Sequence, residues 1–118
     1  MIVHAETGTF NKTVYDPYVN LLRTQTEAMS AALGGAHSVT VLPFDHFFHQ
    51  AGEFSERIAR NQQILLKEEA YLDKITDVAG GAYYLEILTD AIAEQAWQLF
   101  LEVDGRGGFL VAMKEGFI

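Results

Sequence analysis

Segments with strand character and segments with helical character alternate along this chain. Three short runs have strand character: Ile2–Glu6, Ser38–Leu42 and Lys74–Val78. A longer segment with a helical pattern follows each of them. This βαβαβα order predicts an α/β fold in which parallel strands are joined by right-handed crossovers and helices cover the sheet.

The helical segments have recognisable ends. Asp16-Pro17 fits an N-cap followed by proline at the first helical position, and Gly34-Gly35 fits a helix C-terminus. Residues between them recur every three or four positions and predict a buried helix face: Val19, Leu22, Thr26, Met29 and Leu33. Ser55 is the expected N-cap of a second helix. That helix would bury Ile58, Gln62, Leu65, Leu66 and Leu72.

The last third of the chain contains the longest helical run, "AYYLEILTDAIAEQAWQLFLEV", in which Thr89 is a second candidate N-cap. The segment "FLVAMKEGF" predicts one further short helix. Trp97, Leu99 and Phe100 could form a surface on which a cofactor stacks. Within a long amphipathic helix such residues more often belong to a core or an interface.

Three parallel strands leave Ile2–Glu6 and Lys74–Val78 as sheet edges with unpaired backbone groups. The first run starts next to Met1, so we expect no preceding element to cover it. In a closed β/α barrel the same three units would have neighbours on both sides. We therefore expect residues 1–118 to form a single partial domain. The isolated chain should self-associate through its open edges.

The charge balance limits the possible partners. Eight Lys and Arg residues are scattered among 16 Asp and Glu residues, giving a net charge of −8, which predicts no nucleic-acid partner and no membrane partner. The chain has no cysteine for a disulfide or a thiolate metal site. The N-terminus lacks the features of a signal peptide, and no apolar run reaches membrane-spanning length. We expect a soluble, cytoplasmic protein.

The stretch "SVTVLPFDHFFH" places His46 and His49 three residues apart after a strand-like run. On a helical turn the two imidazoles could share a metal ion. No carboxylate or third histidine completes a ligand set, however, and Pro43 and Gly52 indicate a loop. We predict two ordinary loop histidines and no metal site.

Several motifs, in order along nearly the whole chain, resemble methylmalonyl-CoA mutases: "DPYVNLLRTQTEAMSA", "SERIARNQQ", "GGAYYLE" and the terminal "GGF". In this family an eight-stranded β/α barrel binds acyl-CoA along its axis, and a separate C-terminal domain carries cobalamin. The resemblance implies that this chain is the last three units of such a TIM (β/α)8 barrel. The family's reaction is the radical interconversion of methylmalonyl-CoA and succinyl-CoA.

The resemblance also identifies departures from catalytic members at the first strand. Those members carry His-x-Gln-Thr-Ser-Gly where this chain has His4-Ala5-Glu6-Thr7-Gly8. His4 and Thr7 match, whereas Glu6 replaces the glutamine and Gly8 the serine. Glu6 would place a carboxylate beside an anionic CoA ester, which is unfavourable.

At the second strand, catalytic members resemble Gln-Ser-Leu-His-Thr-Asn-x-x-Asp-Glu-Ala. Ser38 and Asp45 match, but Leu42 replaces the asparagine, His46 the glutamate and Phe47 the alanine. Leucine cannot supply the amide's donor and acceptor, and phenylalanine adds bulk where a nucleoside would lie. The resemblance thus implies no catalytic residue and a set of degenerate positions facing substrate or cofactor: His4, Glu6, Ser38, Leu42, His46 and Phe47.

These departures resemble the small, non-catalytic subunit of a heterodimeric mutase. The function implied is structural support for the catalytic large subunit. Adenosylcobalamin would belong to the holoenzyme and not to this chain, so the isolated chain should be inactive. His49-Gln50-Ala51-Gly52 mimics the tail of the cobalamin-ligating Asp-x-His-x-x-Gly, but Phe47 occupies the aspartate position. The alternative is a self-contained, non-enzymatic α/β binding or assembly module, which would need capped sheet edges.

Overall fold

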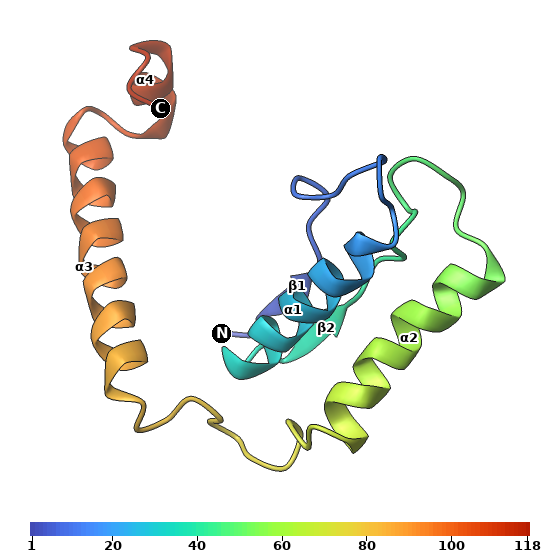
Figure 1. Ribbon diagram of the computed structural model, residues 1–118. Helices are drawn as coiled ribbons and strands as arrows, with labels where there is room; N and C mark the ends of the chain where they lie inside the picture. The colour runs from blue at the N-terminus through green and yellow to red at the C-terminus, as the bar shows by residue number, and fades with distance from the viewer. The chain divides into compact units, whose positions relative to one another are not determined.

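The computed structural model describes residues 1–118 and contains two compact units, Met1–Ala79 and Gly80–Ile118, here called the N-terminal and C-terminal units. The N-terminal unit contains β1 (His4–Glu6), α1 (Val19–Leu33), β2 (Ser38–Thr40) and α2 (Glu53–Glu68) (Figure 1). The C-terminal unit contains α3 (Tyr83–Gly105) and α4 (Phe109–Lys114). The chain is therefore a mixed α/β protein, as predicted.

β1 and β2 form a parallel pair in which His4 lies opposite Ser38 and Glu6 opposite Thr40. The predicted third strand, Lys74–Val78, was wrong, because the sheet has only these two strands. The Lys74 backbone N–H donates to the Tyr71 carbonyl in a turn, 3.1 Å away. Lysine and aspartate disfavour strands, so the two apolar residues of this run do not outweigh its turn-forming ones.

The two ends of α1 differ in how well the sequence predicts them. Its N-cap is Tyr18 and no side chain caps the helix, so the expected cap at Asp16 was wrong. Asp16 instead belongs to a turn, in which its carbonyl accepts the Val19 N–H at 3.2 Å. The glycine-rich C-terminus is confirmed. Gly35 has a φ of +73°, and the Ala36 N–H donates back to the Ala31 carbonyl at 3.0 Å, as in a Schellman motif.

The buried face of α1 is not the apolar stripe that the periodicity predicts. Asn20, Thr24 and Ala28 are buried, at spacings of four, whereas Leu22 is 70% exposed and Met29 39%. Few apolar side chains are available to pack against α1, because the core is small. It consists of Ala28, Val41, Ala59 and Leu66, with Val39 and Leu72 packed against it.

α2 begins after Gly52, so Ser55 is not its N-cap. Ser55 nevertheless stabilises this end from the third helical position. Its hydroxyl accepts the Gly52 N–H and donates to the Gly52 carbonyl, both at 3.0 Å. Four residues of α2 are buried: Ser55, Ala59, Gln62 and Leu66. The predicted core residue Leu65 is exposed, while Leu72 packs on the core from beyond the helix end.

α3 is one continuous helix. Thr89 does not cap a second helix, because its hydroxyl donates to the Leu85 carbonyl, 2.7 Å away within the same helix. The predicted short helix α4 is confirmed. Arg106, directly after α3, links the two helices. It forms an ion pair with Glu102 of α3 at 2.9 Å, and its guanidinium lies over the ring of Phe117, which follows α4, at 4.0 Å from the ring centroid. None of the helices combines the length and apolar composition needed to cross a membrane.

Candidate functional site

The two-stranded sheet has one apolar and one polar face. Side chains alternate along a strand, and paired residues of neighbouring strands share a face. Val39 packs against core residues of α1 and α2, so both helices lie on its side of the sheet. His4 and Glu6 of β1, with Ser38 and Thr40 of β2, therefore belong to the opposite face. The structure thus brings three of the six predicted positions, His4, Glu6 and Ser38, onto one polar face.

His4 joins the two strands on this face. Its Nδ1 atom lies 2.7 Å from Ser38 Oγ, and its Nε2 atom lies 3.3 Å from Thr40 Oγ1. A neutral imidazole accepts at one nitrogen and donates at the other, and hydroxyl groups can adapt to either arrangement. Both ring nitrogens therefore have partners. Glu6 lies two residues further along β1 and adds a carboxylate to the same face.

The residues after the strands are held together by Thr7. This buried residue donates its N–H to the Thr40 carbonyl at 3.1 Å, and its Oγ1 atom accepts the Leu42 N–H at 2.9 Å. Leu42 is half-buried and has no polar side-chain atom. Neither its backbone N–H nor its side chain is therefore available to bind a polar ligand.

His46 and Phe47 lie in an exposed turn after β2, which confirms the predicted loop. The rings of Phe47 and Phe48 contact each other edge to face, with centroids 5.0 Å apart. The His49 N–H closes the turn by donating to the Asp45 carbonyl at 2.9 Å. No three His, Asp or Glu side chains come close enough together to hold a metal ion.

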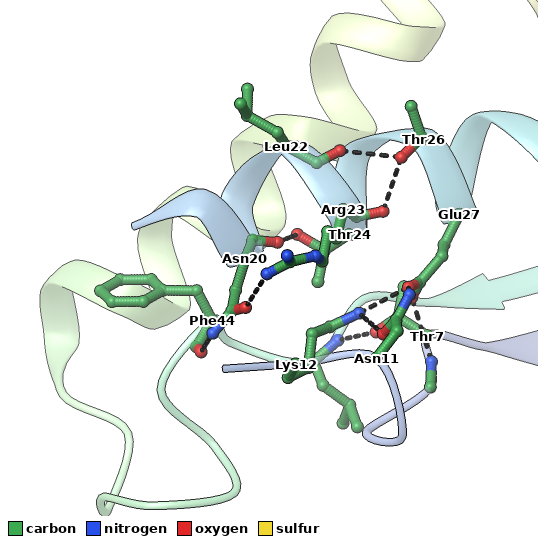
Figure 2. Close-up of polar contacts among 12 residues, drawn as sticks. Thr7, Asn11, Lys12, Asn20, Leu22, Arg23, Thr24, Thr26, Glu27 and Phe44 are labelled. Atoms are coloured by element: carbon green, nitrogen blue, oxygen red, sulfur yellow. Dashed lines mark hydrogen bonds and ion pairs between the residues drawn. The ribbon is translucent and has the colours of Figure 1, made fainter. Parts of the chain in front are cut away.

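A polar cluster that the sequence analysis missed fixes the loop between β1 and α1. The carboxylate of Glu27, on α1, accepts hydrogen bonds from the Gly8 N–H at 3.1 Å, from Asn11 Nδ2 at 2.6 Å and from the ammonium group of Lys12 (Figure 2). The Lys12 side chain is only 4% exposed. The signal in the sequence was Lys12, the single cation of this loop.

Opposing effects act on the Glu27 carboxyl. Partial burial raises its pKa, but hydrogen bonds from Lys12 and Asn11, the Lys12 charge and the Gly8 N–H lower it by more. The net pKa of Glu27 lies below its usual value. The ionised carboxylate therefore stabilises the closed loop.

Asn20 forms a second buried network. Its Nδ2 atom donates to the carbonyls of Thr13 and Phe44, at 2.9 and 3.2 Å, and its Oδ1 atom accepts the Thr13 N–H and an Arg23 N–H, at 3.1 and 3.0 Å. One fully buried side chain thus joins the loop before α1 to the turn after β2 (Figure 2). The loops that follow both strands are fixed to α1 in this way.

A third polar contact joins the two helices of the N-terminal unit. The Gln62 Nε2 atom donates to the Leu21 carbonyl at 2.6 Å, and the Gln62 side-chain amide also bonds Thr24 Oγ1, 3.0 Å from Nε2. Asn20 and Thr24 lie within the motif "DPYVNLLRTQ", and Gln62 lies within "SERIARNQQ". Two of the motifs that carry the family resemblance therefore supply buried scaffold contacts.

Comparisons with known proteins agree with this resemblance. The family model described as methylmalonyl-CoA mutase matches residues 1–118. The methylmalonyl-CoA mutase small subunit of Porphyromonas gingivalis is 58% identical over 115 residues, which cover 98% of this chain and 19% of that protein. The small subunit of Streptomyces virginiae is 44% identical, with the same two coverages.

A methylmalonyl-CoA mutase of Cereibacter sphaeroides is 44% identical over 113 residues, or 96% of this chain and 16% of that protein. The chain thus spans about a fifth or less of the length of these relatives.

Proposed function

Because this chain belongs to the methylmalonyl-CoA mutase family, we propose that it is a segment of the small subunit and that this subunit structurally supports the catalytic large subunit. In this proposal the segment contributes the last β/α units of the TIM barrel. The different cover on the two faces of the sheet supports this proposal, since α1 and α2 cover only the face that carries Val39. A barrel has the same arrangement, with helices outside and strand residues of the inner face lining the axis.

The observation that carries the non-catalytic role is a contrast within the N-terminal unit. The scaffold contacts of Asn20, Thr24 and Gln62 are all formed. The positions that face substrate or cofactor in catalytic relatives instead carry Glu6 and Leu42, which differ from the family's catalytic motifs. A subunit that shapes and stabilises an assembly needs the first set and not the second.

Adenosylcobalamin supplies the radical chemistry of the family's holoenzyme. The residues of this chain do not fit the adenosyl group of that cofactor. Leu42 has no polar side-chain atom, and its N–H is already bonded to Thr7. Phe47 packs on Phe48 in the exposed turn. In our proposal the cofactor is therefore bound elsewhere in the holoenzyme, and this segment takes part in no chemical step.

The alternative, a self-contained binding module, is less well supported. The family match extends over all 118 residues. The sheet also has only two strands, each with a free edge. Such a sheet is marginally stable without further cover.

A chimeric subunit tests the proposal. Residues 1–118 would replace the matching stretch of the Porphyromonas gingivalis small subunit, which would then be purified together with the large subunit that its name implies. We expect the two chains to form a stable complex that converts methylmalonyl-CoA to succinyl-CoA at a rate near that of the native pair. The matched control is the same chimera with Asn20→Ala, which should lose most of the complex.

Two results would contradict the proposal. A folded chimera that fails to bind the large subunit would exclude the support role. Mutase activity of the chimeric subunit alone would exclude the non-catalytic assignment.

A further inference from the structure

Tyr71, which follows the end of α2, has an unusual backbone conformation. Its φ is +55°, and every other residue of the chain with a positive φ is a glycine. A tyrosine is crowded in this left-handed region, because its Cβ atom approaches the following carbonyl oxygen. Tyr71 is therefore a point at which the backbone of the N-terminal unit is strained.

Hydrogen bonds hold the chain in this conformation at the end of α2. The helix first widens, as the Ala70 N–H donates to the Leu65 carbonyl at 3.0 Å. The chain then turns back at Tyr71, so that the Leu72 N–H donates to the Leu66 carbonyl at 3.1 Å. Left-handed residues just after a helix are usually glycines, which have no Cβ atom. Here a tyrosine occupies such a position.

The strained turn places the Leu72 side chain on the core of the N-terminal unit. Leu72 packs against the core cluster that contains Leu66, and this burial offsets the strain. Leu72 and Asp73 also form one wall of a largely apolar cavity, whose other walls include residues of α1, β2 and α2. Residues 71–73 are here called the strap, because they join the end of α2 to the core.

The strap is weakly held on the side away from α2. The Lys74 N–H donates to the Tyr71 carbonyl at 3.1 Å, and no residue from 75 to 79 takes part in a backbone hydrogen bond. The Tyr71 side chain is 61% exposed, so its own burial contributes little. Segments with few buried contacts and few backbone hydrogen bonds open locally at a low free energy.

We propose that the strap is a conformational device that opens while the rest of the N-terminal unit stays folded, because opening releases the strain at Tyr71. In the open state Tyr71 has a negative φ, the Leu72 N–H has left the Leu66 carbonyl, and the Leu72 side chain has left the core. The apolar cavity then lacks one wall, and the core residue Leu66 is exposed. This inference does not depend on the proposed function.

Hydrogen exchange at the Leu72 N–H measures the opening, because this group exchanges only after it leaves the Leu66 carbonyl. Exchange is followed by NMR in the full 118-residue chain, at urea concentrations below the unfolding transition. The Gln62 N–H, within α2, reports unfolding of the whole unit. After correction for intrinsic rates, we expect Leu72 to exchange at least about tenfold faster than Gln62. Urea should hardly change the Leu72 rate, since a local opening exposes little surface.

Three variants separate the strain from the apolar contact. Tyr71→Gly removes the crowded Cβ atom and should slow exchange at Leu72 about fivefold. Ala70→Gly is the matched control, because Ala70 is exposed and does not have a positive φ, and it should leave the rate unchanged or raise it. Leu72→Ala removes the contact with the core and should raise exchange at position 72 at least about tenfold.

Three results would overturn the inference. Equal rates at Leu72 and Gln62, with the same urea dependence, would show that the strap opens only when the whole unit unfolds. Exchange at Leu72 as fast as in an unstructured chain would show that the strap is not closed in solution. Slower exchange in both glycine variants, or in neither, would reject the strain at Tyr71 as the cause of opening.

Discussion

Replacement of Asn20 by alanine should destabilise the N-terminal unit far more than replacement of an exposed asparagine. Asn20 is fully buried and makes four hydrogen bonds. Its contact with the Phe44 carbonyl is buried, whereas the contacts with Thr13 and Arg23 are partly buried. A buried polar group left without a partner costs about 1–3 kcal/mol, and a partly solvated one costs less. We therefore expect a loss of about 3 kcal/mol in the free energy of unfolding.

Urea unfolding followed by far-UV circular dichroism measures this loss. With a slope of about 1.5 kcal/mol per molar urea, typical of a chain of this size, the midpoint should fall by about 2 M. Asn61→Ala is the matched control, because Asn61 is an exposed residue of α2. Its midpoint should shift by no more than about 0.3 M, as surface substitutions usually do.

Asn20→Asp separates the hydrogen bonds from the packing. Aspartate has nearly the same volume, but it replaces the Nδ2 donor with an oxygen that faces the carbonyls of Thr13 and Phe44. This variant should be at least as unstable as Asn20→Ala at neutral pH and should recover in part as its carboxyl is protonated. A midpoint for either variant within error of Asn61→Ala would refute the reasoning.

Further predictions concern the loop, ligands and assembly. The lowered pKa of Glu27 means that its ionised form contributes stability above the unfolded-state pKa of about 4.3, and this contribution is lost as pH falls through the folded-state pKa. Thermal melting between pH 3 and 6 should therefore be less pH-dependent in Glu27→Gln than in the control Glu69→Gln. Isothermal titration should detect no adenosylcobalamin binding to the isolated chain, and a saturable micromolar curve would contradict this. Elemental analysis of untagged protein should find no stoichiometric metal, whereas one metal per chain that is lost in His46→Ala would overturn the loop interpretation. Sedimentation equilibrium should show self-association through the open strand edges, and a cooperatively folding monomer at all concentrations would favour a self-contained module.

The sequence predicted the elements better than their buried faces. Helix existence followed from long periodic segments, and the end of α1 followed from the left-handed conformation that Gly35 adopts. The buried face of α1 did not follow, because periodicity ranks residues by hydrophobicity. The buried positions Asn20 and Thr24 are polar, and their contacts depend on groups 7 to 38 residues away in the chain.

The candidate site was predictable where it depends on strand alternation. His4, Glu6 and Ser38 share a face because β1 and β2 pair in parallel register. The Lys12–Glu27 cluster was not predictable, since it requires the path of the loop between β1 and α1. The expected third strand failed because a run with two apolar residues among charged ones specifies a strand only when a neighbouring strand pairs with it.

The position of Leu42 explains how a residue after a strand end can change without disturbing the scaffold. Thr7 holds position 42 through the backbone N–H and not through the side chain. Any residue other than proline can supply that N–H, so replacement of an amide by leucine leaves the link between the two strand ends unchanged. Asn20, Thr24 and Gln62, by contrast, bond through their side chains and have no such freedom. A position held in the way that Leu42 is held can therefore change while these contacts stay intact, which is what the proposed support role requires.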